Sequence, residues 1–150
     1  MRKSAALICA ILLILSCLFG CTRAPAKAEG DGEIHTEFEG IYLSLSSISD
    51  DEKGNKALSV RWNNETGHEA IYGEAFYIER YSNGLWIDAS EYEHSYIAIA
   101  CILKAHSSND KTYSAEGFDL SREGRYRLRT EFSADGDSYS TWIEFDITKE

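Results

Sequence analysis

The sequence predicts an all-β protein, an antiparallel β-sandwich of about seven or eight strands. Short segments in which apolar and polar residues alternate recur along the chain, which is the pattern of strands with one buried face. Turn residues separate these segments, most clearly at Asn83-Gly84, where both residues tolerate the positive φ angles of a tight hairpin. Residues 38–150 show no convincing helical pattern. We place the centre of the domain at residues 57–86, which hold three successive strand-like segments.

The chain begins with a targeting segment. Arg2 and Lys3 form a short basic head, and the apolar run from Ala5 to Phe19 follows. The run is shorter than the roughly 20 apolar residues of a membrane span and has the form of a signal peptide. It ends in Leu18-Phe19-Gly20-Cys21, which resembles the lipobox of bacterial lipoproteins. The resemblance implies cleavage after residue 20 and a lipid on Cys21; an ordinary secretory signal with an incidental Cys21 is the alternative.

Residues 21–37 are predicted to be a flexible tether, and residues 38–150 the folded domain. The tether contains the chain's only proline, Pro25, and lacks apolar periodicity. Loss of residues 1–20 removes two of the 15 basic residues and none of the 25 acidic ones, so the mature chain carries a formal charge of −12. Such a charge repels nucleic acid and anionic lipid head groups. We therefore expect no nucleic-acid partner.

Within the domain, alternating or β-rich segments predict strands in chain order. They lie at residues 40–46, 58–62, 70–81, 85–87, 111–120, 124–132 and 139–147. Polar segments between them predict turns at 49–56, 63–69 and 106–110, and an acidic crossover at 88–94. The apolar run 96–103 fits either a buried strand or a short buried helix, although its β-branched and aromatic residues favour the strand.

The last two strands allow a register to be predicted. With residues 134–137 as a four-residue loop, Leu128 lies opposite Ile143, and both face inward. On the outer face this register pairs oppositely charged residues, or a cation with an aromatic ring: Arg127 with Glu144, Arg125 with Asp146, and Arg129 with Trp142.

The cysteines exclude an internal disulfide in a processed lipoprotein. Cys9 and Cys17 leave with the signal peptide and Cys21 carries the lipid, so Cys101 remains alone. Because Cys101 lies in an apolar run with no basic residue close by in sequence, we expect a buried, unreactive side chain.

Several motifs together resemble a bacterial immunoglobulin-like (Ig-like) domain of exported lipoproteins. Leu120 to Tyr126 resembles the tyrosine corner of Ig-like domains, in which a tyrosine hydroxyl bonds to backbone a few residues upstream. Leu128 then stands where antibody domains carry their second cysteine, with Val60 or Trp62 as the expected partner. The other matching segments are Trp62-Asn63-Asn64, residues 72–79, Gly84-Leu85-Trp86 and Gly124-Arg125-Tyr126-Arg127. The resemblance implies a fold and no catalytic residue.

Neither a metal site nor a cofactor is predicted. His35, His68, His94 and His106 are far apart in sequence and lack zinc-ligand spacing, so we expect solvated histidines in loops or in the tether. Asp135-Gly136-Asp137 is typical of a hairpin turn. The acidic pairs Glu65/Glu69 and Glu91/Glu93 could act as acid and base across a cleft, but chance explains them equally well in so acidic a chain.

The predicted function is that of a membrane-anchored, extracytoplasmic lipoprotein with a non-catalytic interaction domain. Its partners would be the membrane, through the lipid on Cys21, and an envelope protein or a glycan. A small-ligand or glycan-binding lipoprotein is the second hypothesis, and an envelope hydrolase the third. Outward-facing aromatic and basic side chains mark the candidate binding surface: Trp86, Trp142, Arg129 and Tyr77.

Overall fold

A computed structural model describes residues 32–148, which form nine strands. The strands are β1 (Ile34–Thr36), β2 (Ile41–Asp50), β3 (Lys56–Asn64), β4 (Ala70–Ser82), β5 (Leu85–Asp88), β6 (Cys101–Leu103), β7 (Ser107–Ser114), β8 (Gly124–Ala134) and β9 (Asp137–Ile147). This part of the chain contains no helix, and thus none long and apolar enough to cross a membrane.

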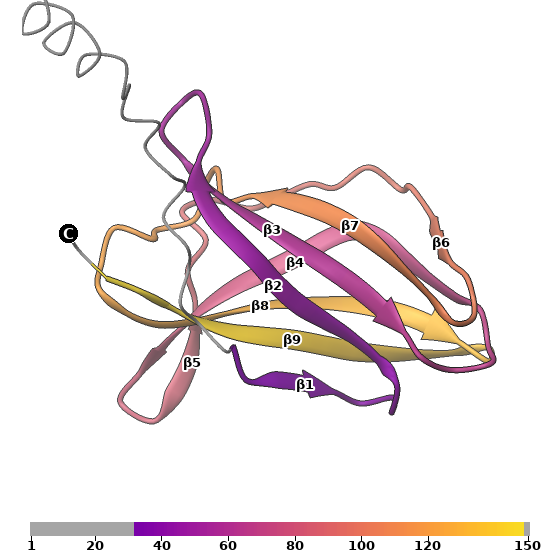
Figure 1. Ribbon diagram of the computed structural model, residues 1–150. Coiled ribbons are helices and arrows are strands. Elements are labelled where there is room, and N and C mark those ends of the chain that lie inside the picture. Colours follow the sequence, from indigo (N-terminus) through magenta and orange to yellow (C-terminus); the bar gives the residue numbers. More distant parts are fainter. Residues whose placement is uncertain (1–31, 149–150) are drawn as a thin grey trace, which may run out of the picture.

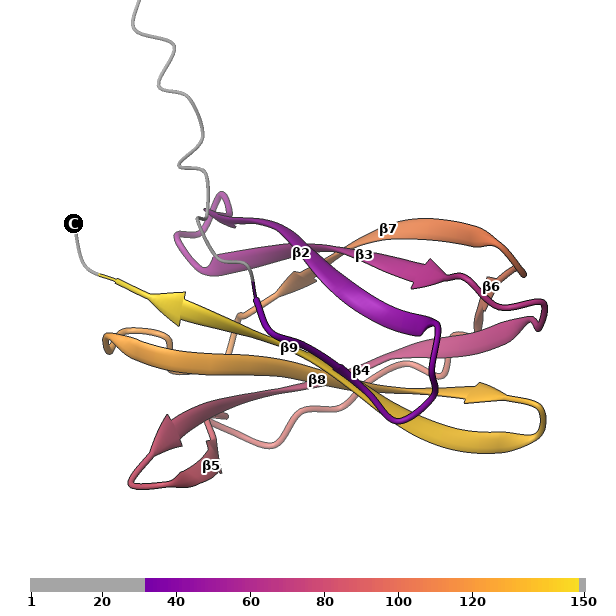
Figure 2. The ribbon, with the colours of Figure 1, turned by 60° about the horizontal axis from the view of Figure 1, so that its bottom comes forward.

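The strands form two antiparallel sheets that pack face to face (Figures 1 and 2). The large sheet has the order β1-β9-β8-β4-β5, with β6 paired to one end of β4. The small sheet has the order β2-β3-β7. The predicted all-β antiparallel sandwich is therefore confirmed, with nine strands in the described residues where seven or eight were expected.

The core lies between the sheets and is built from the alternate residues of each strand. In β8, Tyr126, Leu128, Thr130 and Phe132 are all buried, as the alternation predicted. Trp62 of β3 is fully buried and stacks on Tyr72 of β4, with ring centroids 4.4 Å apart. Because β3 and β4 belong to different sheets, this aromatic contact joins the two layers.

Both predicted hairpins are present. Asn83 and Gly84 have φ angles of 52° and 84° and form a two-residue turn between Ser82 and Leu85. The β8–β9 register is as predicted, with Leu128 opposite Ile143. The loop at 134–137 is tighter than expected, because the ladder continues to Ala134 and Asp137 and leaves a two-residue Asp-Gly turn with positive φ at both positions.

The folded region begins earlier than predicted. β1 falls inside residues 21–37, the segment expected to be a tether, and pairs with β9 through Ile34↔Ile143 and Thr36↔Thr141. Three residues are too few to show an alternating pattern, so sequence periodicity could not detect this edge strand. The predicted signal peptide, Cys21 and the predicted tether up to residue 31 lie outside the described residues.

The apolar run 96–103 is neither a buried strand nor a helix. Only Cys101–Leu103 is a strand, and the preceding isoleucines are exposed, Ile97 by 69% and Ile99 by 45%. The run lies along the edge of β4, and the side chains on one side of the run remain open to water. The strand predicted at 111–120 is shifted: β7 spans Ser107–Ser114, although Phe118 and Leu120 are buried as part of a loop.

Cys101 is half-buried, where full burial was predicted, because it lies on the short edge strand β6 while packing against the core. We therefore expect a thiol reagent at neutral pH to modify native Cys101 measurably, but several-fold more slowly than in the unfolded chain. Ellman's reagent with and without denaturant measures both rates. Equal rates in the two states would contradict the packing of this side chain.

Candidate functional site on the outer face of the large sheet

The face of the large sheet that points away from the small sheet is an ordered array of aromatic and charged side chains, which we call the outer face. Cross-strand pairing fixes its rows. One row runs Tyr77, Arg129, Trp142 and His35 across β4, β8, β9 and β1. A second row runs Asp88, Glu79, Arg127 and Glu144 across β5, β4, β8 and β9.

Cations and aromatic rings pack against one another within and between these rows. The Arg127 guanidinium lies 4.6 Å from the centroid of Trp86 and 5.5 Å from that of Trp142. Trp142 also stacks on His35, with centroids 5.1 Å apart and planes 11° from parallel. Arg129 lies 4.7 Å from the Tyr77 ring centroid. Each such cation–π contact contributes about 0.5–1 kcal/mol at an exposed site and more where water is excluded.

Glu79 is the charged centre of the array. Its Oε2 accepts a 2.6 Å hydrogen bond from Nε of Arg127 and lies 3.6 Å from Nε of Arg129. The side chains of Glu79 and Arg127 are both largely covered. Glu79 therefore holds Arg127 in place between the tryptophans.

The three pairs predicted from the hairpin register lie opposite one another as predicted, but their side chains contact other partners. Arg127 pairs with Glu79, where Glu144 was expected. Arg125 contacts Glu144 and Glu33, where Asp146 was expected. Arg129 lies over Tyr77, where Trp142 was expected. Long side chains can reach diagonal neighbours as well as the residue directly opposite. In addition, β4 lies on the other side of β8 and supplies partners such as Glu79 and Tyr77, which cannot be seen when the β8–β9 hairpin is considered alone.

The four predicted binding-surface residues lie on this one face. Tyr77 and Tyr81 are exposed, whereas Trp86 and Trp142 are half-covered by Arg127 and their neighbours. Sequence reasoning placed Arg127 on the outer face but missed its contacts with Glu79 and the tryptophans, and it missed Glu79 and His35 as members of the array. The strict alternation of β8 was a signal for Arg127, but nothing local indicated that His35 belonged to a strand.

Because the His35 ring stacks on Trp142 and the Arg127 guanidinium lies 5.5 Å from its ring centroid, we expect Trp142 to act mainly in stability. We expect Trp142→Ala to lower the free energy of unfolding by about 1–2 kcal/mol, the sum of a lost cation–π contact and a lost aromatic stack. Denaturant unfolding measures this. Unchanged stability together with loss of partner capture would instead make Trp142 a recognition residue.

The prediction of solvated histidines holds for two of the four. His106 is exposed, and His68 is exposed while lying 2.9 Å from Asp135. His94 is half-buried and stacks on Phe118 at 4.2 Å, because the 89–100 segment folds back onto the loop after β7. His35 is half-buried in β1.

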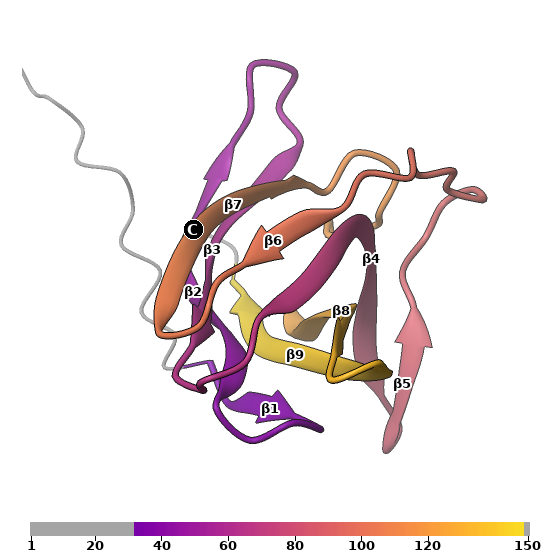
Figure 3. The ribbon, with the colours of Figure 1, turned by 90° about the vertical axis from the view of Figure 1, so that its right-hand side faces the viewer.

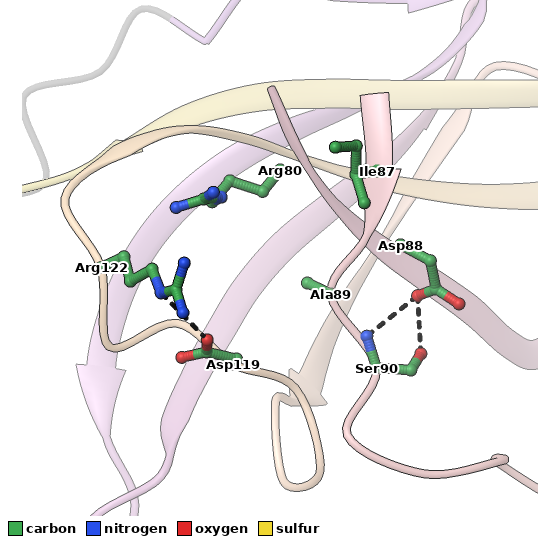
Figure 4. Close-up of a pocket in the computed structure, with 7 residues that line it drawn as sticks. All are labelled: Arg80, Ile87, Asp88, Ala89, Ser90, Asp119 and Arg122. Atoms are coloured by element: carbon green, nitrogen blue, oxygen red, sulfur yellow. Dashed lines mark hydrogen bonds and ion pairs between the residues drawn. The ribbon is translucent and has the colours of Figure 1, made fainter. Parts of the chain in front are cut away.

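A shallow pocket of about 220 Å³ lies where the β4–β5 hairpin meets the loop before β8 (Figure 4). Its carboxylates are already engaged: Asp88 accepts hydrogen bonds from Ser90, and Asp119 accepts them from Ser121. The side-chain hydrogen bond from Ser121 holds the pKa of Asp119 below its usual range. A general acid needs a raised carboxyl pKa, so Asp119 is unsuited to that role.

The corner before β8 has the geometry that the sequence motif predicted. The Tyr126 hydroxyl donates a 2.8 Å hydrogen bond to the carbonyl oxygen of Arg122, four residues upstream. The strand partition agrees as well, since β2, β3 and β7 form one layer and β4, β8 and β9 the other, as in Ig-like sandwiches.

Comparison with known proteins agrees with this architecture. None of the curated proteins compared with the chain matches it significantly. A family model described as "Bacterial Ig-like domain" matches residues 37–147, most of the 150-residue chain. The chain therefore belongs to the bacterial Ig-like domain family.

Proposed function

We propose that this protein is a lipid-anchored, extracytoplasmic lipoprotein whose Ig-like domain binds a protein of the cell envelope and catalyses no reaction. Two sequence features support the anchor: the signal-like segment and the lipobox-like Leu18-Phe19-Gly20-Cys21. Family membership supports an accessory or interaction domain. The observation that carries the binding role is the β4–β5 hairpin.

This hairpin extends to the side of the large sheet away from the small sheet (Figure 3). Within the part of the chain that the structure describes, β5 pairs only with β4. Both of its faces carry apolar groups in contact with water. Leu85 is 67% exposed and Ile87 50% on one face, while Tyr81 beside Trp86 is 44% exposed on the other. Clustered exposed apolar side chains mark protein-interaction sites, and a projecting hairpin offers two surfaces to a partner.

Glycan binding is the second candidate, supported by the exposed Tyr77 and Tyr81 two pleats apart on β4. Sugars stack on free aromatic faces. Since Arg127 already covers one face of both Trp86 and Trp142, the array offers few free rings, and the protein partner is favoured.

Pull-down from solubilised envelopes with the full chain tests the proposed binding role. We expect the double variant Leu85→Ser, Ile87→Ser to lose the captured protein while its unfolding midpoint stays near that of the wild type. Ile97→Ser is the matched control, because Ile97 is an equally exposed aliphatic residue away from the hairpin. Capture that survives in the double variant would contradict the hairpin site. Binding to purified glycans that depends on Tyr77 and Tyr81 would favour the second candidate.

The anchor is tested separately with Cys21→Ala. Without the thiol no thioether-linked lipid can form, so we expect release from the membrane fraction or accumulation of an uncleaved precursor. Fractionation and gel mobility measure both, with Cys101→Ala as the control. A Cys21→Ala protein that is acylated and processed like the wild type would contradict the proposal.

A further inference from the structure

We infer that Glu33, His35 and Glu144 form a binding site for a divalent transition-metal ion, zinc being the best fit, where the folded domain begins. Residues two apart on a strand point to the same side, so β1 and the residue before it direct Glu33 and His35 together. β9 brings Glu144 beside them, with the Glu144 amide donating a 3.3 Å hydrogen bond to the Glu33 carbonyl. One imidazole nitrogen and two carboxylate oxygens are ligands that zinc accepts.

The two distances from the imidazole to the carboxylates suit a tetrahedral ion. Nε2 of His35 lies 3.5 Å from Oε1 of Glu33 and 3.4 Å from Oε1 of Glu144. All three donor atoms fall within 4.8 Å of one another. With metal–ligand bonds of about 2.0–2.1 Å, tetrahedral geometry separates neighbouring ligands by about 3.3–3.4 Å. The two histidine distances are long for hydrogen bonds but match this separation.

The burial of these groups calls for a partner. Nε2 of His35 is shielded from water and makes no hydrogen bond to any of residues 32–148. The Glu144 side chain is only 9% exposed, and although its Oε2 contacts Arg125, its Oε1 faces Nε2 of His35 at 3.4 Å. Buried polar atoms are normally paired, and carboxylates on adjacent strands repel each other. A cation among the three donors satisfies both requirements.

Arg125 orients the carboxylates without filling the site. Its Nη2 contacts Oε2 of Glu33 at 3.0 Å and Oε2 of Glu144, which leaves Oε1 of each glutamate directed toward His35. The positive charge of Arg125 offsets one of the two carboxylates, so Glu33, Glu144 and Arg125 together keep one negative charge for an incoming ion. The stack on Trp142 fixes the imidazole ring, the role that surrounding groups play at protein metal sites.

An ion here would tie β1 to β9 and so secure the point where the chain enters the domain. Glu33 is largely exposed, which gives an ion access from solvent and leaves room for a water as fourth ligand.

Tryptophan fluorescence tests the site, since the Trp142 ring lies 5.1 Å from the His35 ring and a bound Co²⁺ would quench it. We expect one equivalent of Co²⁺ to quench the full chain, prepared without a histidine tag, and Zn²⁺ to reverse the quenching and raise Tm. His35→Gln and Glu33→Gln should each weaken Co²⁺ binding at least tenfold. His68→Gln is the matched control, because His68 lies beside the carboxylate of Asp135 in the β8–β9 turn and is not a member of the cluster of Glu33, His35 and Glu144.

The outcomes separate the alternatives. Quenching retained in His35→Gln, or lost equally in His68→Gln, would overturn the site. Stability that rises on acidification but ignores Zn²⁺ would show an imidazolium between two carboxylates and would equally overturn it. Because Glu33 is exposed and outside the core, Glu33→Gln keeps the test valid if His35→Gln unfolds in EDTA.

Discussion

Replacement of Trp62 by alanine should lower the free energy of unfolding by about 3–5 kcal/mol, the range for a buried aromatic side chain cut to a methyl group. Trp62 is fully buried, stacks on Tyr72 at 4.4 Å and meets the edge of Phe132 at 5.9 Å. Its Nε1 also donates a 3.3 Å hydrogen bond to the Tyr113 hydroxyl. The substitution removes all three contacts and leaves a cavity.

The position of Trp62 explains why the effect should be so large. Trp62 and Tyr113 belong to the small sheet, whereas Tyr72 and Phe132 belong to the large one. Antibody domains join their layers by a disulfide, but Cys101 is the one cysteine among the described residues. The aromatic cluster around Trp62 performs this bridging role.

Denaturant unfolding of Trp62→Ala, with Trp142→Ala as the outer-face comparison, measures the difference. Trp62→Phe should fall between wild type and Trp62→Ala, because a ring remains to stack on Tyr72 while the Tyr113 hydroxyl loses its donor. A cost for Trp62→Ala no greater than that for Trp142→Ala would show that the sheets are held together elsewhere.

The parts of the fold that the sequence predicted are those specified by neighbouring residues. The Asn83-Gly84 hairpin and the β8–β9 register follow from a turn and the alternation on either side of it. Burial of Leu128 and Ile143 follows in turn, because a slip of one residue would expose the whole apolar row. The tyrosine corner is also local, since Tyr126 and Arg122 are four residues apart.

The remaining features depend on strands that are distant in sequence. Arg127 bonds to Glu79, 48 residues away, because β4 lies beside β8, and the hairpin alone could not show this. β1 becomes a strand through pairing with β9 at the other end of the chain. Ile97 is exposed although it lies in an apolar run of the sequence. Residues 96–100 lie at an open edge of the sheet, and the arrangement of distant strands decides where that edge is. The residue types of the outer face could be predicted from the sequence, but their contacts could not.

Leu128→Ala should cost about 2–5 kcal/mol, as expected for a fully buried leucine between two packed sheets. Tyr126→Phe should cost only about 1 kcal/mol, because the ring stays packed on Phe145 and only the hydrogen bond to the Arg122 carbonyl is lost. Urea midpoints of the two variants, with exposed Ile99→Ala as the near-neutral control, give the order. If Tyr126→Phe instead proved less stable than Leu128→Ala, the hydrogen bond from Tyr126 to the Arg122 carbonyl would contribute more to stability than the burial of Leu128.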